Sequence, residues 1–377
     1  MKFFFALGAC LYFANVGFAA TPLSLNLAQS LADTKAKLAA GGQADIMMIG
    51  DSLEFNVMPY FQQDMHAQYG DAGAGYQGFS VWSGAGEDPG WTRGLINGDV
   101  DPHMSLDGLW SSTNVATSAS FLQQDESSQL QYVAQPGGGS FTYDVYGTPH
   151  NVSTASTTVQ LKSVTITGRP DWATNPYWIS SAGTGTVTIL GQENVTTNSG
   201  VRIDRTANGG WGVANFLQRD QTFDLQMKLV NPDLVTVWLG QNDQSYSRSD
   251  YGQKLTALLA RIRTNVPNAE VVFIGTYDQG SPNLHQLVDA MADVAQTNDV
   301  GFINLFDTAG SAKFMNDMGY LADGIHFSQT GSAYMGDFLY QTFLTDGANL
   351  TPEPSCLSVL AIISIGLTSR IRKRSAV

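Results

Sequence analysis

Cysteine is nearly absent from this chain, and acidic residues outnumber basic ones. The 377 residues include only Cys10 and Cys356, and each lies in a terminal segment that we expect to be removed or kept apart from the fold. A folded domain without cysteine has neither a disulfide framework nor a thiolate metal site. The formal net charge is −14, so we expect no nucleic-acid partner.

Histidine is scarce as well, and the five residues are His66, His103, His150, His285 and His326. No two of them have the spacing of metal ligands, so we expect neither a metal site nor a cofactor. A triple glycine at residues 137–139 has no helical pattern after it. It therefore indicates a hairpin turn rather than a phosphate-binding loop.

The N-terminus has the pattern of a secretory signal. Lys2 precedes an apolar stretch at residues 3–16, and residues 17–19 (Gly-Phe-Ala) form a small-x-small cleavage site. We therefore expect residues 1–19 to be a signal peptide and the protein to be exported.

The C-terminal apolar run, residues 356–367, is shorter than the roughly 20 residues that a membrane span needs. It follows residues 352–355 (Pro-Glu-Pro-Ser) and precedes four basic residues. This three-part tail, residues 352–377, resembles the PEP-CTERM sorting signal of certain Gram-negative bacteria. The resemblance implies an exosortase-type processing enzyme as a partner and a transient association with the membrane. An ordinary C-terminal anchor is the alternative, and both readings place the body of the protein in the periplasm, at the cell surface or in the extracellular matrix.

Short apolar runs alternate with helical patterns in two parts of the chain. Buried strands are predicted at residues 44–49, 234–239, 269–275 and 300–305, and helices at 23–38, from about 53, at 250–264, 285–297 and 331–344. This alternation predicts an α/β fold with a parallel sheet and helices on both faces.

The middle of the chain, residues 81–204, shows no convincing helix and predicts an antiparallel β-sandwich-like insertion. Residues 140–147 alternate cleanly, and residues 186–190 form another strand. The apolar positions at 159–166 change parity, which indicates a bulge near Ser163. The insertion would divide the α/β domain into residues 20–80 and 205–350.

Ser52 lies between a buried strand and a helix, in residues 50–53 (Gly-Asp-Ser-Leu). That position places its hydroxyl at the carboxyl end of the sheet, where open α/β folds bind ligands. The helix N-terminus offers N–H groups and the positive end of a dipole. A serine that only caps the helix is the alternative interpretation.

Two further segments carry polar side chains to the same edge. Asn242 directly follows the strand at 234–239 and can donate to an oxyanion, although asparagine is also common in turns. Asp323 and His326 are three residues apart before the last helix, so the carboxylate can orient the imidazole. A solvated loop histidine is the alternative.

These segments resemble the SGNH (GDSL) hydrolase family. Residues 50–53, 240–243 (Gly-Gln-Asn-Asp) and 323–326 (Asp-Gly-Ile-His) match its first, third and last blocks. Residues 208–212 are a looser match to the second block, with Gly210 favoured as the oxyanion glycine and Gly212 as the alternative. The resemblance implies the SGNH-type, flavodoxin-like three-layer fold. Residues 69–76 and the β insertion are similar to bacterial polysaccharide or peptidoglycan O-acetylesterases.

The resemblance implies that Ser52 is the nucleophile, His326 the base and Asp323 the residue that orients His326. The oxyanion hole would comprise Ser52, Gly210 and Asn242, while Asp51 and Asp243 would bind loop amides. The expected activity is that of a secreted serine esterase acting on an O-acylated glycan. Alternatives are a lipase or lysophospholipase, a glycan O-acyltransferase, and a catalytically silent glycan-binding surface protein.

Four aromatic residues of the insertion are candidates for stacking on sugar rings: Trp110, Trp172, Tyr177 and Trp178. Packing in the core of the sandwich is the alternative for each of them.

Overall fold

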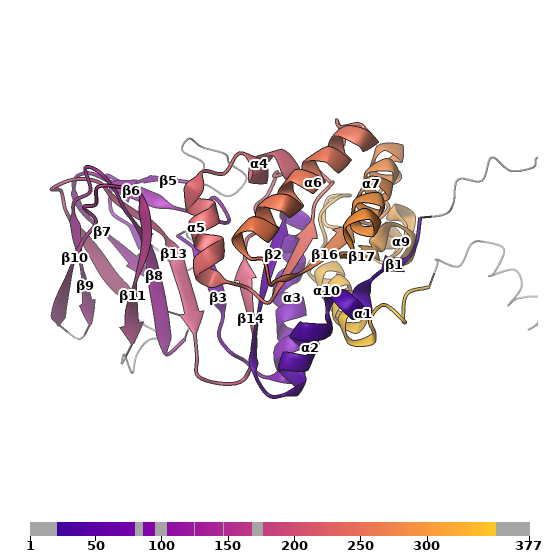
Figure 1. The fold of residues 1–377 in the computed structure, drawn as a ribbon, viewed down its shortest axis with the longest axis horizontal. Coiled ribbons are helices and arrows are strands. Elements are labelled where there is room, and N and C mark those ends of the chain that lie inside the picture. Colours follow the sequence, from indigo (N-terminus) through magenta and orange to yellow (C-terminus); the bar gives the residue numbers. More distant parts are fainter. Residues whose placement is uncertain are drawn as a thin grey trace, which may run out of the picture.

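The computed structural model describes residues 21–79, 86–94, 104–123, 125–145, 147–167 and 176–351. It contains an α/β unit and a β sandwich lying side by side, and both ends of the described chain lie on the α/β unit (Figure 1). The predicted signal peptide, residues 1–19, and the predicted tail, residues 352–377, lie outside the described residues.

The α/β unit is built on one six-stranded sheet. Its strand order is β1 (Ser24–Leu25), β17 (Gly301–Asn304), β16 (Glu270–Gly275), β15 (Leu234–Trp238), β2 (Gln43–Gly50) and β14 (Gly200–Arg205). Every pair is parallel except β1 with β17. The central strand β15 is buried along its whole length, as expected for a parallel strand covered on both faces.

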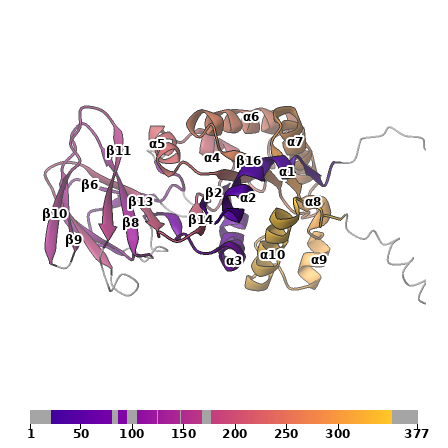
Figure 2. The same ribbon diagram turned by 60° about the horizontal axis from the view of Figure 1, so that its bottom comes forward.

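Helices cover both faces of this sheet, and Figure 2 shows α6 and α7 on one side of it and α3 and α10 on the other. The first layer comprises α4 (Val213–Leu217), α5 (Gln221–Val230), α6 (Arg248–Asn265) and α7 (Pro282–Asn298). The second comprises α1 (Leu27–Ser30), α2 (Ala32–Ala39), α3 (Ser52–Tyr69), α8 (Leu305–Thr308), α9 (Ala312–Asp317) and α10 (Gln329–Thr345). The predicted three-layer α/β fold is confirmed.

The single helix predicted at residues 23–38 is wrong in its first part. Residues 24 and 25 form β1 and pair with β17, and α1 and α2 are separate helices. Leu31 between them has φ −128°, outside the helical region. The sequence pattern cannot distinguish one helix from two short ones that bury the same leucines.

The β sandwich comprises two antiparallel sheets. One has the order β10 (Thr148–Ser153), β9 (Ser140–Val145), β12 (Tyr177–Ala182), β7 (Ala116–Phe121) and β4 (Gly86–Glu87). The other has the order β11 (Gln160–Thr167), β8 (Ser127–Ala134), β13 (Val187–Val195), β6 (Ser111–Thr113) and β5 (Thr92–Arg93), and β3 (Gly75–Gly78) also pairs with β13. A separate apolar core that includes Phe121, Phe141 and Ile179 lies between the sheets.

The strand pairing differs from the predicted division at residues 80 and 205. β14 is an edge strand of the parallel sheet, although residues up to 204 were expected in the insertion. β3 belongs to the sandwich through β13, although it was expected in the α/β domain. β3 is short and rich in glycine, and β14 alternates apolar with charged residues, so neither strand is the continuous apolar run expected of a buried parallel strand.

Charged contacts join the two units at this junction. Arg202 of β14 pairs with Asp45 of β2 and, at 3.2 Å, with Glu193 of β13. The backbone N–H of Tyr76 in β3 donates to Asp204 of β14 at 2.9 Å. The two units therefore share a polar interface in addition to the covalent connections.

The predicted bulge near Ser163 is wrong. β11 pairs with β8 in unbroken register from Gln160 to Thr167, and the register shift lies in β13 between Ile189 and Gly191. The parity change has another cause, because β11 packs on both faces. Leu161 contacts the small cluster around Trp110, whereas Val164 contacts the sandwich core.

The glycine turn at residues 137–139 does not close a hairpin. It joins β8 of one sheet to β9 of the other, and these two strands are not paired. The close approach of the backbone of Thr154 explains glycine at 138, because a Cβ there would lie 1.9 Å from the Thr154 oxygen. The sequence identified the turn correctly but not the strands that it connects.

Candidate active site

Ser52 is the first residue of α3, directly after β2. Asp51 caps the helix, and its Oδ1 accepts the Leu53 N–H at 2.8 Å. Gly50 is required before it, because a Cβ at that position would lie 1.8 Å from Oε2 of Glu54. The tight strand–turn–helix geometry thus places the Ser52 hydroxyl at the carboxyl edge of the sheet and at the positive end of α3.

A chain of hydrogen bonds joins three of the predicted site residues. The Ser52 hydroxyl lies 2.9 Å from Nε2 of His326. Nδ1 of His326 lies 2.7 Å from Oδ2 of Asp323. Ser52 is 274 residues from His326 in the sequence, so the parallel sheet is what brings the two segments together. In this geometry Nδ1–H donates to the carboxylate, and Nε2 is free to accept from the serine.

Asp323 orients the histidine loop while staying exposed to solvent. Its Oδ1 accepts the N–H groups of His326 at 2.8 Å and Ile325 at 3.0 Å. Hydrogen bonds from His326, to both backbone and side chain, and from Ile325 lower the pKa of Asp323 to about 2. The carboxylate is therefore ionised at every pH at which an esterase would be assayed.

Buried aromatic residues hold the loop that carries His326 in place. The Tyr277 hydroxyl donates to the Ile325 carbonyl at 2.6 Å, and the Phe327 ring packs on the rings of Tyr277 and Trp238. Gly324 has φ +87°, a conformation that side-chain-bearing residues rarely adopt, which allows the sharp turn between Asp323 and His326.

The glycine turn before α4 distinguishes the two candidate oxyanion glycines. The Gly212 N–H donates to Oδ1 of Asn215 at 2.8 Å, so that amide is already occupied. Among the described residues, no hydrogen bond uses the N–H of Gly210 or Ser52. Gly210 is exposed and has φ +76°. The free amides of Ser52 and Gly210 are the ones available to a ligand.

Asn242 is exposed at the end of β15 and is anchored to the same turn. Its Nδ2 donates to the Trp211 carbonyl at 2.9 Å. Because an amide nitrogen carries two hydrogens, this contact fixes the orientation of Asn242 and leaves one donor for a ligand.

Two buried carboxylates support the site from behind, as expected for Asp51 and Asp243. Asp243 accepts the Val213 N–H at 3.0 Å and so positions the glycine turn. Burial raises the pKa of Asp51 to about 7 and that of Asp243 to about 6. They hold backbone amides and lie away from solvent, which is a structural role.

The sequence analysis missed Glu54, a third buried acid below the serine. Its Oε1 accepts from the Thr236 hydroxyl at 3.0 Å, and burial raises its pKa well above the usual range. Glu54 thus links α3 to β15 and fills the space behind Gly50. Its signal in the sequence is an acidic residue two positions after Ser52, in the first turn of the helix.

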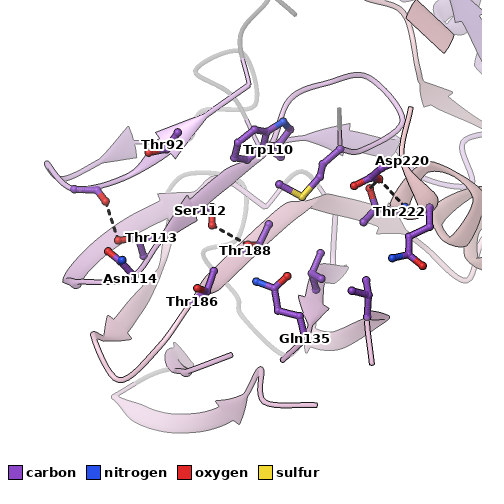
Figure 3. A pocket seen from close by; sticks show the side chains of 15 residues that line it. Thr92, Trp110, Ser112, Thr113, Asn114, Gln135, Thr186, Thr188, Asp220 and Thr222 are labelled. Carbon is purple, nitrogen blue, oxygen red and sulfur yellow. Dashed lines mark hydrogen bonds between the residues drawn. The ribbon is translucent and has the colours of Figure 1, made fainter. Parts of the chain in front are cut away.

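The aromatic residues of the insertion have different environments. Trp110 and Tyr177 are buried, Trp178 is 49% exposed, and Trp172 lies outside the described residues. Trp110 borders a cavity of 510 Å³ between the sandwich and the start of α5. Figure 3 shows hydroxyl and amide side chains around it, including the bonded pair Ser112 and Thr188. Of the three that the structure describes, Trp178 is the one exposed enough for a sugar ring to stack on it.

The part of the chain that the structure describes contains no cluster of three or more histidine, cysteine or acidic residues that could hold a metal ion. No helix in this part is both long and apolar enough to cross a membrane.

Comparison with known proteins gives one family match. Residues 165–334 match the model of the GDSL-like lipase/acylhydrolase family. The match includes Gly210, Asn242, Asp323 and His326, and begins after Ser52. No curated protein matches the sequence.

Among solved structures, a peptidoglycan O-acetylesterase has the same fold. The identity is 18%, the match covers 86% of this chain and 99% of the other, and the TM-score is 0.72. A family two carbohydrate esterase from Cellvibrio japonicus matches at 12% identity, 69% and 97% coverage and a TM-score of 0.30. A lipase/acylhydrolase from Enterococcus faecalis matches at 21% identity, 42% and 81% coverage and a TM-score of 0.31. Residues 165–334 are thus similar to GDSL-like lipases and acylhydrolases, and the chain shares its fold with a peptidoglycan O-acetylesterase.

Proposed function

We propose that this protein is an exported serine esterase that removes acetyl groups from a glycan. The observation that carries the proposal is the hydrogen-bond chain from Ser52 through His326 to Asp323, with distances of 2.9 and 2.7 Å. Such a chain activates a serine hydroxyl for attack on an ester carbonyl. The predicted signal peptide supports export, and the fold shared with a peptidoglycan O-acetylesterase supports an acetylated glycan as substrate.

The first half-reaction forms an acetyl-enzyme. The Ser52 oxygen bonds to the acetyl carbonyl carbon while Nε2 of His326 takes the hydroxyl proton. The negative charge on the carbonyl oxygen is bound by the N–H groups of Ser52 and Gly210 and by Nδ2 of Asn242. The tetrahedral intermediate then expels the sugar oxygen, which takes the proton from His326 and leaves as a hydroxyl.

The second half-reaction reverses these roles with water. His326 removes a proton from a water molecule while the water oxygen bonds to the acetyl carbon. The same three donors bind the resulting oxyanion. Ser52 leaves with the proton from His326, and acetate is released. Asp323 stabilises the imidazolium in both halves, which its low pKa allows at any working pH.

The tail at residues 352–377 supports a route to the cell surface or matrix with an exosortase-type enzyme as processing partner. This part of the proposal rests on the sequence pattern alone.

Hydrolysis of p-nitrophenyl acetate tests the reaction class. The purified protein should release p-nitrophenol, and Ser52→Ala should reduce the rate by on the order of 10⁴ or more, since the nucleophile is lost. Acetate release from acetylated polysaccharide and peptidoglycan then identifies the substrate. Equal rates for the wild type and Ser52→Ala would contradict serine catalysis.

A further inference from the structure

Arg205 is a cation at the serine end of the parallel sheet. Side chains alternate along β14, and Val201 and Ile203 pack in the core on the α3 side, so Arg205 also faces α3. Its guanidinium carbon lies 4.9 Å from the centre of the Phe55 ring. Phe55 follows Ser52 by one helical turn, a rise of about 5 Å. Arg205 is therefore close to the site that the proposed function uses.

No acid among the described residues forms an ion pair with Arg205, although the charge of Asp107 acts on it from a longer distance. No hydrogen bond joins Arg205 to the described residues either, and its contact there is the face of Phe55. Arg202 on the same strand differs, because it pairs with both Asp45 and Glu193. Burial lowers the pKa of Arg205, but arginine stays protonated at neutral pH. A half-buried cation that lacks a direct ion pair is unusual in a protein with a net charge of −14.

Arg205 also lines a groove between the two units. The cavity measures 460 Å³ and follows one face of α3, where Pro59, Gln62 and His66 recur at helical spacing. Gln77 and Asp125 of the sandwich form the opposite wall. The groove thus begins near Ser52, at Arg205, and extends away from it with mainly polar walls.

We infer that this groove binds a glycan chain and that Arg205 recognises a carboxylate on a sugar adjacent to the acetylated one. The inference rests on the proposed esterase function and specifies its substrate class. A guanidinium forms two parallel hydrogen bonds with a carboxylate, and the glutamine amides suit neutral hydroxyl groups. Asp71 and Asp125 also line the groove, so their charge disfavours a doubly charged group such as a phosphate.

Binding to a variant that cannot turn over tests the groove separately from catalysis. Ser52→Ala is titrated calorimetrically with tetragalacturonate and with the same tetramer after its carboxyl groups are reduced to alcohols. We expect the acidic tetramer to bind about 10- to 100-fold more tightly, the range for hydrogen bonds to a charged group. Adding Arg205→Met should bring this ratio close to one, and Arg205→Lys should give an intermediate ratio.

Arg263→Met is the matched control. It removes the same charge from the exposed end of α6, where Arg263 donates to the Asn298 carbonyl, and it should leave the ratio unchanged. Equal affinities for the two tetramers would overturn the inference, as would an unchanged ratio in a folded Arg205→Met protein. Failure of the wild type to hydrolyse p-nitrophenyl acetate would instead contradict the esterase function, while the binding ratio would remain readable.

Discussion

At the scale of single residues, the candidate site combines exposed groups, which the proposed mechanism uses, with buried residues that hold them in place. Asp323 and the imidazole of His326 are accessible, with 57% and 39% of their side chains exposed. The groups that hold them are buried, including Tyr277 and Phe327. An ester on a polymer can therefore approach the serine without entering a deep cavity.

Asp323→Asn should lower kcat for p-nitrophenyl acetate by on the order of 10³ to 10⁴, because an amide no longer holds His326 in the tautomer that accepts the serine proton. Asp278→Asn is the control, since Asp278 is an acid near the same loop that caps a turn at Gly280. A kcat within a factor of three of the wild type would remove Asp323 from the mechanism.

Asn242→Ala should lower kcat by about 10² to 10³ with little change in KM, since an oxyanion donor acts mainly in the transition state. The rate is followed with p-nitrophenyl acetate and compared with that of Asn283→Ala, an exposed asparagine on α7. If the variant changed KM alone, Asn242 would be a substrate-binding residue instead.

At the scale of elements, the buried charge of Asp51 at the start of α3 destabilises the folded protein at high pH. The pKa of Asp51 is about 7 in the folded protein, whereas the usual value is 3.8. The folded state thus binds the Asp51 proton more tightly than the unfolded state. The resulting penalty is absent below about pH 4, grows as pH rises and is complete above about pH 7.

Asp51→Asn should therefore raise Tm at pH 8, because asparagine keeps an oxygen for the Leu53 N–H and carries no buried charge. The gain should vanish near pH 4, where Asp51 is neutral. Thermal unfolding followed by circular dichroism across this range provides the check. A variant less stable than the wild type at pH 8 would show that the charged form is favoured in the fold.

The Tyr277 hydroxyl helps to fix the conformation of the loop at residues 323–326. Tyr277→Phe removes the bond to the Ile325 carbonyl and should cost about 1 kcal/mol of unfolding free energy. It should also reduce kcat several-fold by loosening His326, and the two effects are separable by denaturant titration and steady-state kinetics. Unchanged stability and kcat together would show that the packing of Phe327 alone fixes the loop.

At the scale of the whole molecule, much of the α/β fold was predictable because its strands are continuous apolar runs. Residues 44–49, 234–239, 269–275 and 300–305 correspond to β2, β15, β16 and β17. Parallel order then places Ser52, Asn242 and His326 at one edge. Their proximity follows from topology, and the 2.9 Å contact between Ser52 and His326 is what the structure adds.

The features that the sequence did not predict depend on tertiary interactions, which leave no periodic pattern in the sequence. β14 is not a continuous apolar run, because Val201 and Ile203 alternate with Arg202 and Asp204, whose partners lie on β2 and β3. The parity change in β11 suggested a bulge because the sequence does not show that this strand packs on both faces. The environment of Arg205, which is the face of the Phe55 ring at the end of a groove, depends on the fold and leaves no signal in the sequence.

The proposed export predicts that the signal peptide is removed from the mature protein. Expressed with its own termini in a Gram-negative host, the protein should be recovered outside the cytoplasm with Ala20 as its first residue. N-terminal sequencing and intact mass measure this directly. A cytoplasmic protein that retains residues 1–19 would contradict the signal-peptide interpretation.

Covalent labelling tests the central claim, that Ser52 is an activated nucleophile. The purified protein is treated with a fluorophosphonate that reacts with activated serines, and the modified peptide is identified by mass spectrometry. The account predicts one adduct, on Ser52, with labelling strongly slowed in His326→Ala and absent in Ser52→Ala. Labelling of a different serine, or no labelling of a folded wild-type protein, would contradict it.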